Sequence, residues 1–306
     1  MSMSLRGVFP PIPTPFDADE NVDLGALSAN LERWNAYDLA GYVVLGSNGE
    51  AVFLDDRERI AVLERARRAI PADKLMVAGT GCESARETIA LTQQAAAVGA
   101  DAVLVMTPHY YGAMMKPDGL VGYYCAVADA SPIPVLLYNV PKFTRVDMDV
   151  SIILRAAEHA NIAGIKDSSG NVAKLADIVR LTSAGFQVLV GTAGVLFAGL
   201  AVGAVGGVVA LANVAPQQSI DIQRLTEAGR WGEALELQRQ MMPVNAAVTG
   251  RFGIAGLKAA LDMLGYRGGS VRLPLQGIDA DDRDVLRDIL IEGGVLGSAM
   301  SDTQEE

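Results

Sequence analysis

The chain has 306 residues, of which 50% are hydrophobic and 20% are charged, and its formal net charge at pH 7 is −11. This composition is typical of a folded protein with one large domain, or one domain with an appendage, and it excludes an intrinsically disordered chain. The acidic balance argues against nucleic acid and anionic membranes as partners, because both are polyanions that bind to basic patches.

Two cysteines, Cys82 and Cys125, and two histidines, His109 and His159, occur in the chain. Two cysteines are too few for a disulfide framework and are typical of a reducing compartment, so we expect a cytoplasmic protein. The histidines are too few for a histidine-rich metal site, and we expect no metal ligand set. The apolar stretch 195–214 contains four glycines. It predicts a helix followed by a buried strand rather than a membrane span.

Eight short apolar runs recur along the chain, roughly 20–35 residues apart, with helical patterns between them. Because each run is continuously apolar rather than alternating, the runs predict parallel strands that are buried on both faces. In chain order, the eight runs are 8–9, 42–45, 75–78, 102–106, 135–138, 162–165, 188–190 and 208–211.

The segments between the runs carry the start and stop signals of helices. Asp55 with Glu58, and Ser84 with Glu87, have the spacing of a capping box, in which each residue satisfies a backbone donor of the other. Pro71 is expected to end the first of these two helices. The intervening segments are therefore predicted to be helices that connect successive parallel strands.

Eight strand–helix units without a change of composition predict an α/β protein, a (β/α)8 TIM barrel with a C-terminal helical extension. A doubly wound open sheet is the alternative, but no GxGxxG motif follows the first strand. We expect the barrel over residues 1–215 and the extension over 216–306, of which 298–306 is expected to be frayed. The helices predicted after the eighth strand are 218–228, 231–247, 254–264 and 281–291.

Lys166 ends the sixth apolar run. Burial at an apolar strand end penalises the ammonium form of a lysine, and a neutral amine can attack a ketone carbonyl to form a Schiff base. In a (β/α)8 barrel the chemistry gathers at the C-terminal ends of the strands, where this lysine is expected. The alternative is a lysine that extends past the strand end to solvent, or one that pairs with Asp167.

Tyr138 lies 28 residues before Lys166, which is about one strand–helix repeat, so the two side chains are expected on adjacent strands at the same mouth. A phenol beside the amine could transfer the protons that Schiff-base chemistry requires. The loop 46–50 follows the second strand and could hold a carboxylate with its backbone N–H groups. The alternative for Tyr138 is an aromatic residue that only fills the barrel. The alternative for the loop 46–50 is an ordinary strand–helix turn.

Taken together, the segments 46–50, 138–141 and 164–167 resemble the dihydrodipicolinate synthase / N-acetylneuraminate lyase superfamily of class I aldolases. The resemblance covers residues 7 to about 275. Within the superfamily the chain is most similar to the 4-hydroxy-2-oxoglutarate aldolases, through the additional segments 81–84 and 245–254.

The resemblance implies a catalytic role for four residues. Lys166 would form the Schiff base with pyruvate, and Tyr138 would act as the general acid and base on the carbinolamine and on the C4 hydroxyl. Ser47 and Tyr110 would complete a hydroxyl relay, with Tyr110 reaching into the site of a neighbouring subunit. The family usually forms dimers or tetramers, so we expect a homo-oligomer. His109, beside Tyr110, is interpreted as a local hydrogen-bonding residue.

The resemblance also implies the residues that bind the substrate. Ser47 and Asn48 would hold the pyruvyl carboxylate, and Ser168 would contact the distal part of the substrate. Gly191 and the carbonyl of Val209 would line the floor of the pocket.

Phe143 is a departure from the pattern of the synthases, which place an arginine two residues after the proline of the Tyr-Asn-Val-Pro motif. A phenyl ring cannot form a bidentate ion pair with the carboxylate of a second substrate. This residue therefore argues against the condensation of lysine biosynthesis, with Lys142 and Arg145 as the nearby cations that could replace the arginine.

The resemblance implies an enzyme that cleaves a 2-oxo-4-hydroxy acid, 4-hydroxy-2-oxoglutarate, to pyruvate and glyoxylate. The imine itself serves as the electron sink, so we expect no metal and no organic cofactor. Three alternatives remain: a 4-hydroxy-tetrahydrodipicolinate synthase that condenses pyruvate with aspartate semialdehyde, a related sugar-acid aldolase or dehydratase, and a protein that binds pyruvate-like ligands without turnover.

Overall fold

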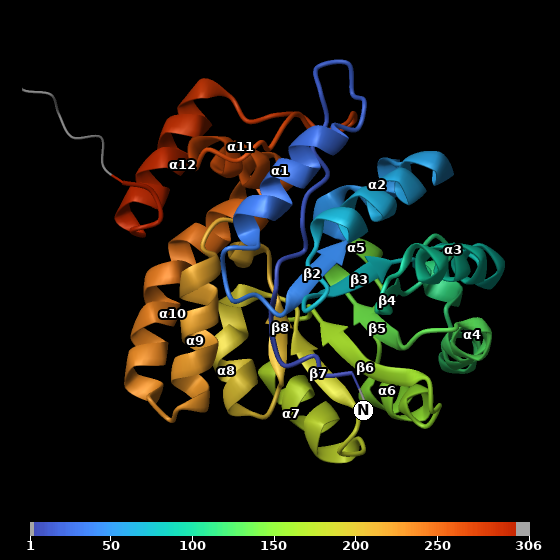
Figure 1. The fold of residues 1–306 in the computed structure, drawn as a ribbon. Helices are drawn as coiled ribbons and strands as arrows, with labels where there is room; N and C mark the ends of the chain where they lie inside the picture. Colours follow the sequence, from blue (N-terminus) through green and yellow to red (C-terminus); the bar gives the residue numbers. More distant parts are fainter. Residues whose placement is uncertain (1–2, 298–306) are drawn as a thin grey trace, which may run out of the picture.

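The structure is a computed structural model that describes residues 3–297, so the predicted fraying of 298–306 lies outside the described residues. Eight strands form one sheet in the order β1-β8-β7-β6-β5-β4-β3-β2, and each pair of neighbours in this order is parallel. The two ends of this order meet, because Pro11 and Val43 form a parallel bridge directly after β1 and within β2. Figure 1 shows the strands surrounded by a ring of helices, which confirms the predicted TIM barrel.

The strands lie where the apolar runs predicted them, with one difference. The eighth strand ends at Val208, and 210–213 form a 3-10 turn instead of extending the strand. Strand β8 begins at Gly206, which pairs with Gly7 of β1. The two backbones are close there, because a Cβ atom on Gly206 would lie 2.1 Å from the carbonyl oxygen of Gly7. The bounds are β1 Gly7–Phe9, β2 Gly41–Val44, β3 Leu75–Gly79, β4 Ala102–Met106, β5 Val135–Asn139, β6 Ile162–Asp167, β7 Gln187–Val190 and β8 Gly206–Val208.

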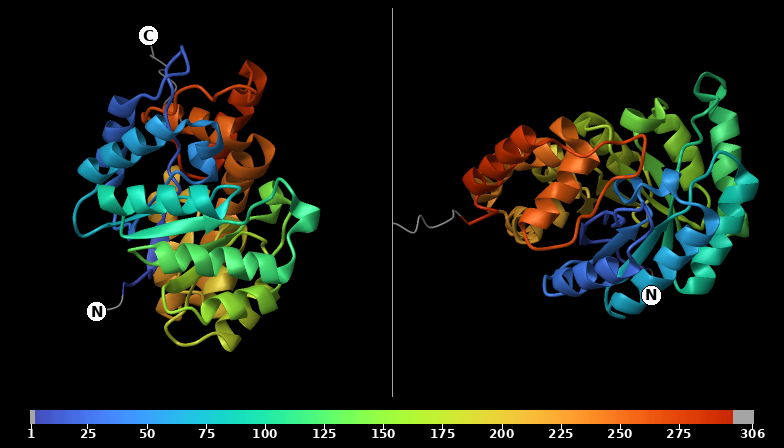
Figure 2. Two further views of the ribbon diagram at one scale, coloured as in Figure 1. Left: turned by 90° about the vertical axis from the view of Figure 1, so that its right-hand side faces the viewer. Right: turned by 90° about the horizontal axis from the view of Figure 1, so that it is seen from above.

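The connecting helices cover the outside of the barrel (Figure 2). Asp55 and Glu58 form the complete predicted capping box, whereas Ser84 accepts from the Glu87 N–H and its hydroxyl donates to the Glu87 carboxylate. The bounds are α1 Leu24–Trp34, α2 Asp56–Ala69, α3 Ala85–Val98, α4 Pro117–Ala130, α5 Pro141–Thr144, α6 Val150–Ala157, α7 Val172–Leu181, α8 Leu196–Ala201 and α9 Pro216–Glu227. Helix α9 follows the last strand and packs against α8 and β1.

Up to residue 297, three further α-helices follow α9: α10 Trp231–Ala246, α11 Gly253–Met263 and α12 Ala280–Glu292. They confirm the helices predicted from the sequence, and Figure 1 shows α10 beside α9 and α12 outside the ring. A π-helical turn, η6 Ala247–Arg251, connects α10 to α11. The division of the chain between residues 215 and 216 stays a prediction.

The barrel interior is a small apolar core, separate from the larger core between strands and helices. Tyr138 belongs to this interior core, so its ring lies above the other interior side chains at the C-terminal end of β5. Strand side chains that contribute to it include Phe9, Val43, Val77, Leu104, Leu136, Leu189 and Val208.

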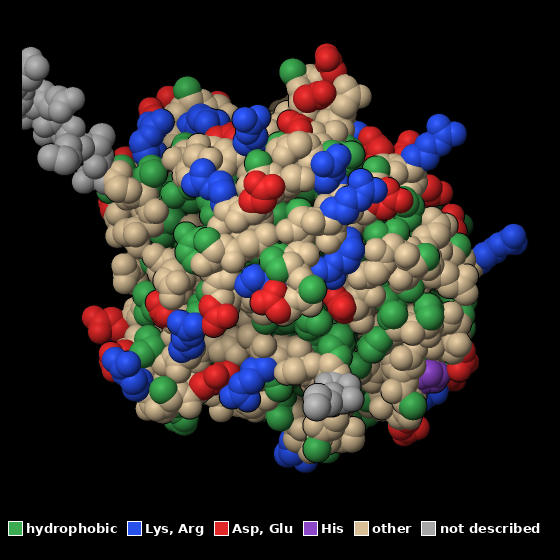
Figure 3. Space-filling model, in the orientation of Figure 1, with side chains coloured by type: hydrophobic (Ala, Val, Ile, Leu, Met, Phe, Trp, Pro, Cys, Tyr) green, Lys and Arg blue, Asp and Glu red, His purple; other side chains and the backbone are tan. Residues whose placement is uncertain are grey.

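The outer surface is strongly charged but mixed in sign. Figure 3 shows Lys and Arg side chains interspersed with Asp and Glu over the face in view, so the basic side chains on this face do not gather into one patch. Among the described helices, none is both long and apolar enough to cross a membrane.

Candidate active site

A cavity of about 360 Å³ lies at the C-terminal ends of the strands, where the sequence placed the chemistry. The structure brings together six of the predicted site residues in its lining: Ser47, Asn48, Tyr138, Lys166, Ser168 and Gly191. Val209 is fully buried and is not among the lining residues, whereas its neighbours Val208 and Ala210 are.

Lys166 lies at the centre of this arrangement. It is 3% exposed, it is the register partner of Tyr138 on the neighbouring strand, and its Nζ lies 4.0 Å from the centroid of the Tyr138 ring. Within the described chain, Lys166 forms no ion pair with a carboxylate. The alternative in which Lys166 pairs with Asp167 is therefore wrong, since successive side chains of a strand point to opposite faces.

Asp167 instead belongs to a polar network on the helix side of β5 and β6. Asn139 donates to Oδ2 of Asp167 and to Oδ1 of Asp147, both at 2.7 Å. Lys174 contacts both carboxylates, at 2.5 Å from Asp147 and 3.6 Å from Asp167. Partial burial alone would raise the pKa of Asp147, but hydrogen bonds from Lys174 and Asn139 lower it below its usual value. This network fixes the two strand ends that carry Tyr138 and Lys166.

The hydroxyl groups of Tyr138 and Ser47 lie 3.3 Å apart, within hydrogen-bond distance, and either could be the donor. Ser47 begins a 3-10 turn, η1 Ser47–Gly49, that directly follows β2 and Gly46. A proton can pass between two hydroxyl groups at this distance, and the relay itself stays a prediction.

The loop 46–50 is held in place from the C-terminal helices. Glu50 has a positive φ of 52° and a fully buried side chain whose Oε1 lies 2.5 Å from Nζ of Lys258 in α11. Its Oε2 accepts a hydrogen bond of 3.0 Å from the backbone N–H of Arg272. Burial lowers the pKa of Lys258, while the nearby Glu50 carboxylate opposes that change.

Gly191 is a position at which no side chain fits. A Cβ atom there would lie 2.0 Å from Oγ of Ser168 and 2.7 Å from the carbonyl oxygen of Asp167. Oγ of Ser168 donates to the carbonyl of Gly191 at 3.1 Å, which orients the serine at the rim of the cavity.

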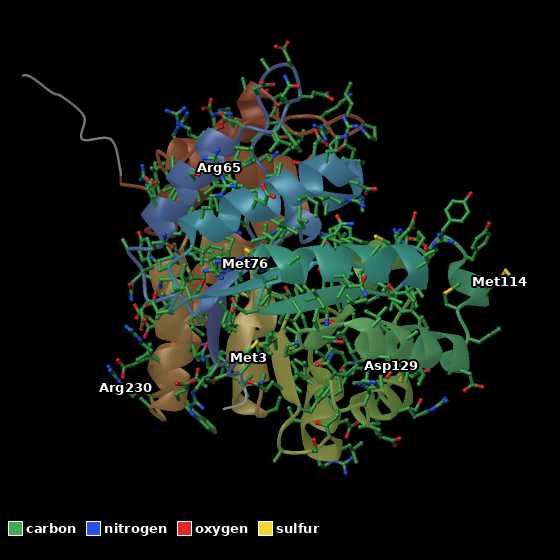
Figure 4. The ribbon with its side chains drawn as sticks, turned by 45° about the vertical axis from the view of Figure 1, so that its right-hand side comes forward. Met3, Arg65, Met76, Met114, Asp129 and Arg230 are labelled. Carbon is green, nitrogen blue, oxygen red and sulfur yellow. The ribbon has the colours of Figure 1, made fainter. Side chains whose placement is uncertain are left out.

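Tyr110 does not join the site of its own chain. It is 77% exposed, its ring makes an edge contact with Tyr111, and its N–H donates to the carboxylate of Glu83. Figure 4 shows Met114, farther along the same loop, at the outer edge of the molecule. The backbone N–H of His109 donates to the Glu83 carboxylate at 2.9 Å, and Nδ1 of its ring lies 2.7 Å from the same carboxylate, so the contacts of His109 are local.

The far wall of the cavity contains Lys142 and Phe143 of α5, the latter at the position where the synthases place an arginine, and residues 248–250 and 252–255 around η6. The sequence marked the segment 245–254 only through the resemblance, and it did not mark 275–276, which also line this wall. No local pattern signals the contact of 275–276 with the site, because it depends on how the C-terminal segments pack over the barrel mouth.

A second cavity, of about 310 Å³, adjoins the first and shares five lining residues with it: Ser47, Tyr138, Phe143, Ile254 and Leu275. Its other lining residues are mostly apolar and include Leu45, Val52, Leu104 and Met106. The hydroxyl pair of Ser47 and Tyr138 thus borders both cavities.

The sequence matches the family model described as the dihydrodipicolinate synthetase family over residues 4–292. It is 36% identical over 288 residues to a 4-hydroxy-tetrahydrodipicolinate synthase of Methanothrix thermoacetophila, covering 93% of this chain and 96% of that protein. It is 35% identical over 294 residues to an uncharacterized DapA-like lyase of Halobacterium salinarum, covering 96% of each.

Solved structures with the same fold agree with this match. A dihydrodipicolinate synthase from Acinetobacter baumannii, solved in complex with pyruvate, superposes with a TM-score of 0.92 at 30% identity, covering 96% of this chain and all (100%) of that one. A dihydrodipicolinate synthase described as the first monomeric variant superposes with a TM-score of 0.90 at 28% identity, covering 95% and 98% of the two chains.

Proposed function

The chain belongs to the dihydrodipicolinate synthetase family, whose members are lyases that form a Schiff base with pyruvate, and from this premise we propose that it cleaves 4-hydroxy-2-oxoglutarate to pyruvate and glyoxylate. The observation that supports an aldolase is the pairing of a buried lysine, Lys166, with the phenol of Tyr138 at the barrel mouth. The lack of an arginine among the described lining residues of the cavity supports a substrate other than that of the synthases.

In the proposed reaction, the neutral amine of Lys166 adds to the C2 carbonyl of the substrate and forms a carbinolamine. Tyr138 protonates the carbinolamine hydroxyl, and water leaves to give the iminium. Tyr138, now a phenolate, removes the proton of the C4 hydroxyl while the electrons of the C3–C4 bond move to the iminium. The aldehyde departs, the enamine takes a proton at C3, and water hydrolyses the imine to pyruvate and the free amine.

Substrate binding in this proposal uses the strand-end loops. Ser47 and Asn48 hold the pyruvyl carboxylate, supported by backbone N–H groups at the turn after β2. Ser168 contacts the distal part of the substrate, and Gly191 and the segment around Val209 close the floor. The polar network behind Lys166 keeps the amine in position.

We also propose a homo-oligomer in which Tyr110 completes the relay of a second copy. Tyr110, Tyr111 and Met114 are large, exposed and close in sequence, which is typical of a surface that binds another protein. The apolar cavity beside Ser47 and Tyr138 is a suitable space for an aromatic ring from that copy. We expect Tyr110→Phe to lose turnover while sedimentation shows that the oligomer stays intact. Full turnover in this variant would contradict the relay.

The first test is reduction with borohydride in the presence of pyruvate, followed by intact-mass and peptide mass spectrometry. We expect a pyruvyl adduct on the peptide that contains Lys166 and none in Lys166→Met. Lys116→Met, which changes an exposed lysine, should trap as wild type does. A folded protein without an adduct would contradict the imine mechanism and favour a binding protein without turnover.

The synthase remains the second candidate, favoured by the names of the relatives at 36% and 32% identity. Parallel assays distinguish the two: release of glyoxylate from 4-hydroxy-2-oxoglutarate against consumption of pyruvate with aspartate semialdehyde. A kcat/KM higher for the condensation than for the cleavage would overturn our assignment of the substrate and retain the shared imine chemistry.

A further inference from the structure

The carboxylate of Glu83 binds the backbone of the loop that carries Tyr110. Glu83 lies in the segment 81–84, which the resemblance singled out but which the proposed mechanism does not use. Its Oε2 accepts hydrogen bonds of 2.9 Å from the N–H groups of His109 and Tyr110, and its Oε1 lies 2.7 Å from Nδ1 of His109. Two successive backbone N–H groups that point at one anion form a binding nest for it. A single side chain thus holds the residue before Tyr110 and the backbone of Tyr110 itself.

The segment that carries Glu83 is itself fixed to its surroundings. The N–H of Cys82 donates to Oγ1 of Thr88 in α3 at 3.0 Å, and its carbonyl accepts a hydrogen bond of 3.2 Å from the hydroxyl of Tyr123 in α4. A Cβ atom on Gly81 would lie 2.5 Å from the backbone nitrogen of Met106, so the segment passes directly against the end of β4. The carboxylate of Glu83 is therefore presented from a well-anchored backbone.

The loop that receives this carboxylate lies between β4 and α4, over residues 107–116. The N–H groups of Gly112, Met114 and Met115 donate to carbonyl oxygens within the loop. The hydrogen bonds to Glu83 instead join the loop to the connection between β3 and α3. Because surface loops are more mobile than the elements they connect, this junction limits the orientations open to the exposed side chain of Tyr110.

We propose that Glu83 is a positioning residue that orients Tyr110 for the hydroxyl relay in the site of a neighbouring copy of the chain. This inference rests on the proposed function, because it concerns the relay that Tyr110 completes there. The phenol oxygen is at the far end of a long side chain, so a small backbone rotation displaces it, and a displacement of about 1 Å can lower a rate about 10²-fold. Glu83 acts on the site of the other copy rather than on the site of its own chain.

Steady-state kinetics in two backgrounds tests this role. Glu83→Ala removes the acceptor of both N–H groups, and we expect kcat with the preferred oxo acid to fall about 10- to 100-fold. KM should change less than about twofold, because Glu83 does not line the substrate cavity. Glu83→Gln keeps an oxygen that can accept from the same N–H groups, so it should retain more turnover. In Tyr110→Phe, where no hydroxyl is left to orient, adding Glu83→Ala should change kcat less than about twofold.

Asp129→Ala is the matched control, because this exposed carboxylate pairs with the other histidine of the chain, His159, and lies outside the cavity lining. It should keep the kcat of wild type. The proposal is overturned if Glu83→Ala lowers kcat equally with and without the Tyr110 hydroxyl, or if Asp129→Ala loses as much. Sedimentation should show Glu83→Ala in the same oligomer as wild type. Dissociation would make Glu83 a residue that holds the assembly together and would also overturn the proposal.

Hybrid oligomers test whether Glu83 acts on the neighbouring copy. Lys166→Met cannot form the imine but keeps an intact Tyr110 loop, so its co-expression with Glu83→Ala should raise turnover per remaining Lys166 above that of Glu83→Ala alone. The double variant Glu83→Ala/Lys166→Met should instead lower turnover per Lys166 when it is co-expressed with wild type. If neither mixture shows its expected change, Glu83 acts within its own chain and the proposal is wrong.

Borohydride trapping separates this inference from the proposed function. The amount of imine at equilibrium does not depend on the rate of proton transfer, so Glu83→Ala should trap as much pyruvate on Lys166 as wild type does after long incubation. A lower yield would show damage to the site itself and overturn the positioning role. No trapping in wild type contradicts the imine mechanism, and full turnover in Tyr110→Phe contradicts the relay and this inference with it. A loss in Tyr110→Phe with full turnover in Glu83→Ala contradicts the role of Glu83 alone.

Discussion

Tyr138 and Lys166 occupy paired positions on β5 and β6, and Nζ of Lys166 lies 4.0 Å from the centre of the phenol ring. Parallel register gives both side chains the same direction, so both enter the cavity at the barrel mouth. The residues that follow each of them, Asn139 and Asp167, are also paired and point to the helix side. Two adjacent pairs thus place the reactive groups on one face of the sheet and their polar support on the other.

Removal of the Tyr138 hydroxyl should affect proton transfer more than folding. We expect Tyr138→Phe to lower kcat by about 10²- to 10⁴-fold, the usual contribution of general acid–base catalysis, and Ser47→Ala to have a smaller effect in the same direction. Steady-state kinetics with the preferred oxo acid measures both. Tyr124→Phe is the control, because this fully buried hydroxyl in α4 has no hydrogen-bond partner among residues 3–297 and lies outside the cavity lining. Equal losses in Tyr138→Phe and Tyr124→Phe would contradict the assigned role.

Gly191→Ala should disturb the site through the backbone. The added methyl group would lie 2.7 Å from the carbonyl oxygen of Asp167, which cannot rotate away as the Ser168 hydroxyl can. We expect a loss of about 1–3 kcal/mol in the free energy of unfolding, typical of overpacking, and weaker trapping of pyruvate. Gly232→Ala, where the new methyl group would meet no described atom within 4 Å beyond its chain neighbours and the backbone of its own helix, should keep wild-type trapping. Urea denaturation and borohydride trapping measure the two effects, and an unchanged Gly191→Ala protein would disprove the clash.

The buried pair of Glu50 and Lys258 should show strong coupling. Lys258→Met leaves a carboxylate buried without its cation, and we expect it to lower the free energy of unfolding by about 3–5 kcal/mol. Glu50→Gln should be less stable than wild type for the converse reason. The double variant should lose clearly less than the two single losses combined, because it removes both charges together. Additive losses in a double-mutant cycle measured by urea denaturation would show that the two side chains do not interact.

The ion pair of Arg272 and Glu58 should make stability depend on pH in the acidic range. The hydrogen bond from Arg272 is the main cause that lowers the pKa of Glu58 below its ordinary value of 4.5. A carboxyl whose pKa is lower in the folded protein contributes stability above its unfolded pKa, and this contribution is lost as pH falls through the folded pKa.

At pH 7 we therefore expect wild type to have a higher thermal unfolding midpoint than Glu58→Gln. This difference should shrink as the pH falls below about 4.5. Thermal denaturation at a series of pH values measures it. Arg287→Gln, which breaks an exposed pair with Asp284 in α12, should show little difference at any pH. A Glu58→Gln difference that grows on acidification would contradict the direction of the pKa change.

Much of the fold could be predicted because its signals are local. Continuous apolar runs identify buried parallel strands, and the capping pair Asp55–Glu58 identifies the start of α2, since both depend on residues within a few positions of one another. The eighth strand lies two residues before its predicted start, because its position depends on the close approach of Gly206 to Gly7. Hydrophobicity does not report this approach. The apolar residues after Val208 indicated burial, but the backbone there turns away from the sheet.

By itself, the sequence determined that Lys166 and Tyr138 share one mouth of the barrel, because the regular strand–helix repeat converts their spacing into adjacency. Only the tertiary structure decided what surrounds them. The hydrogen bond from Lys142 to Thr249 spans 107 residues, and the one from the Arg272 N–H to Glu50 spans 222. Such contacts form when the C-terminal helices pack over the barrel. That arrangement is determined by the burial and packing of whole helices, and no short sequence pattern encodes it.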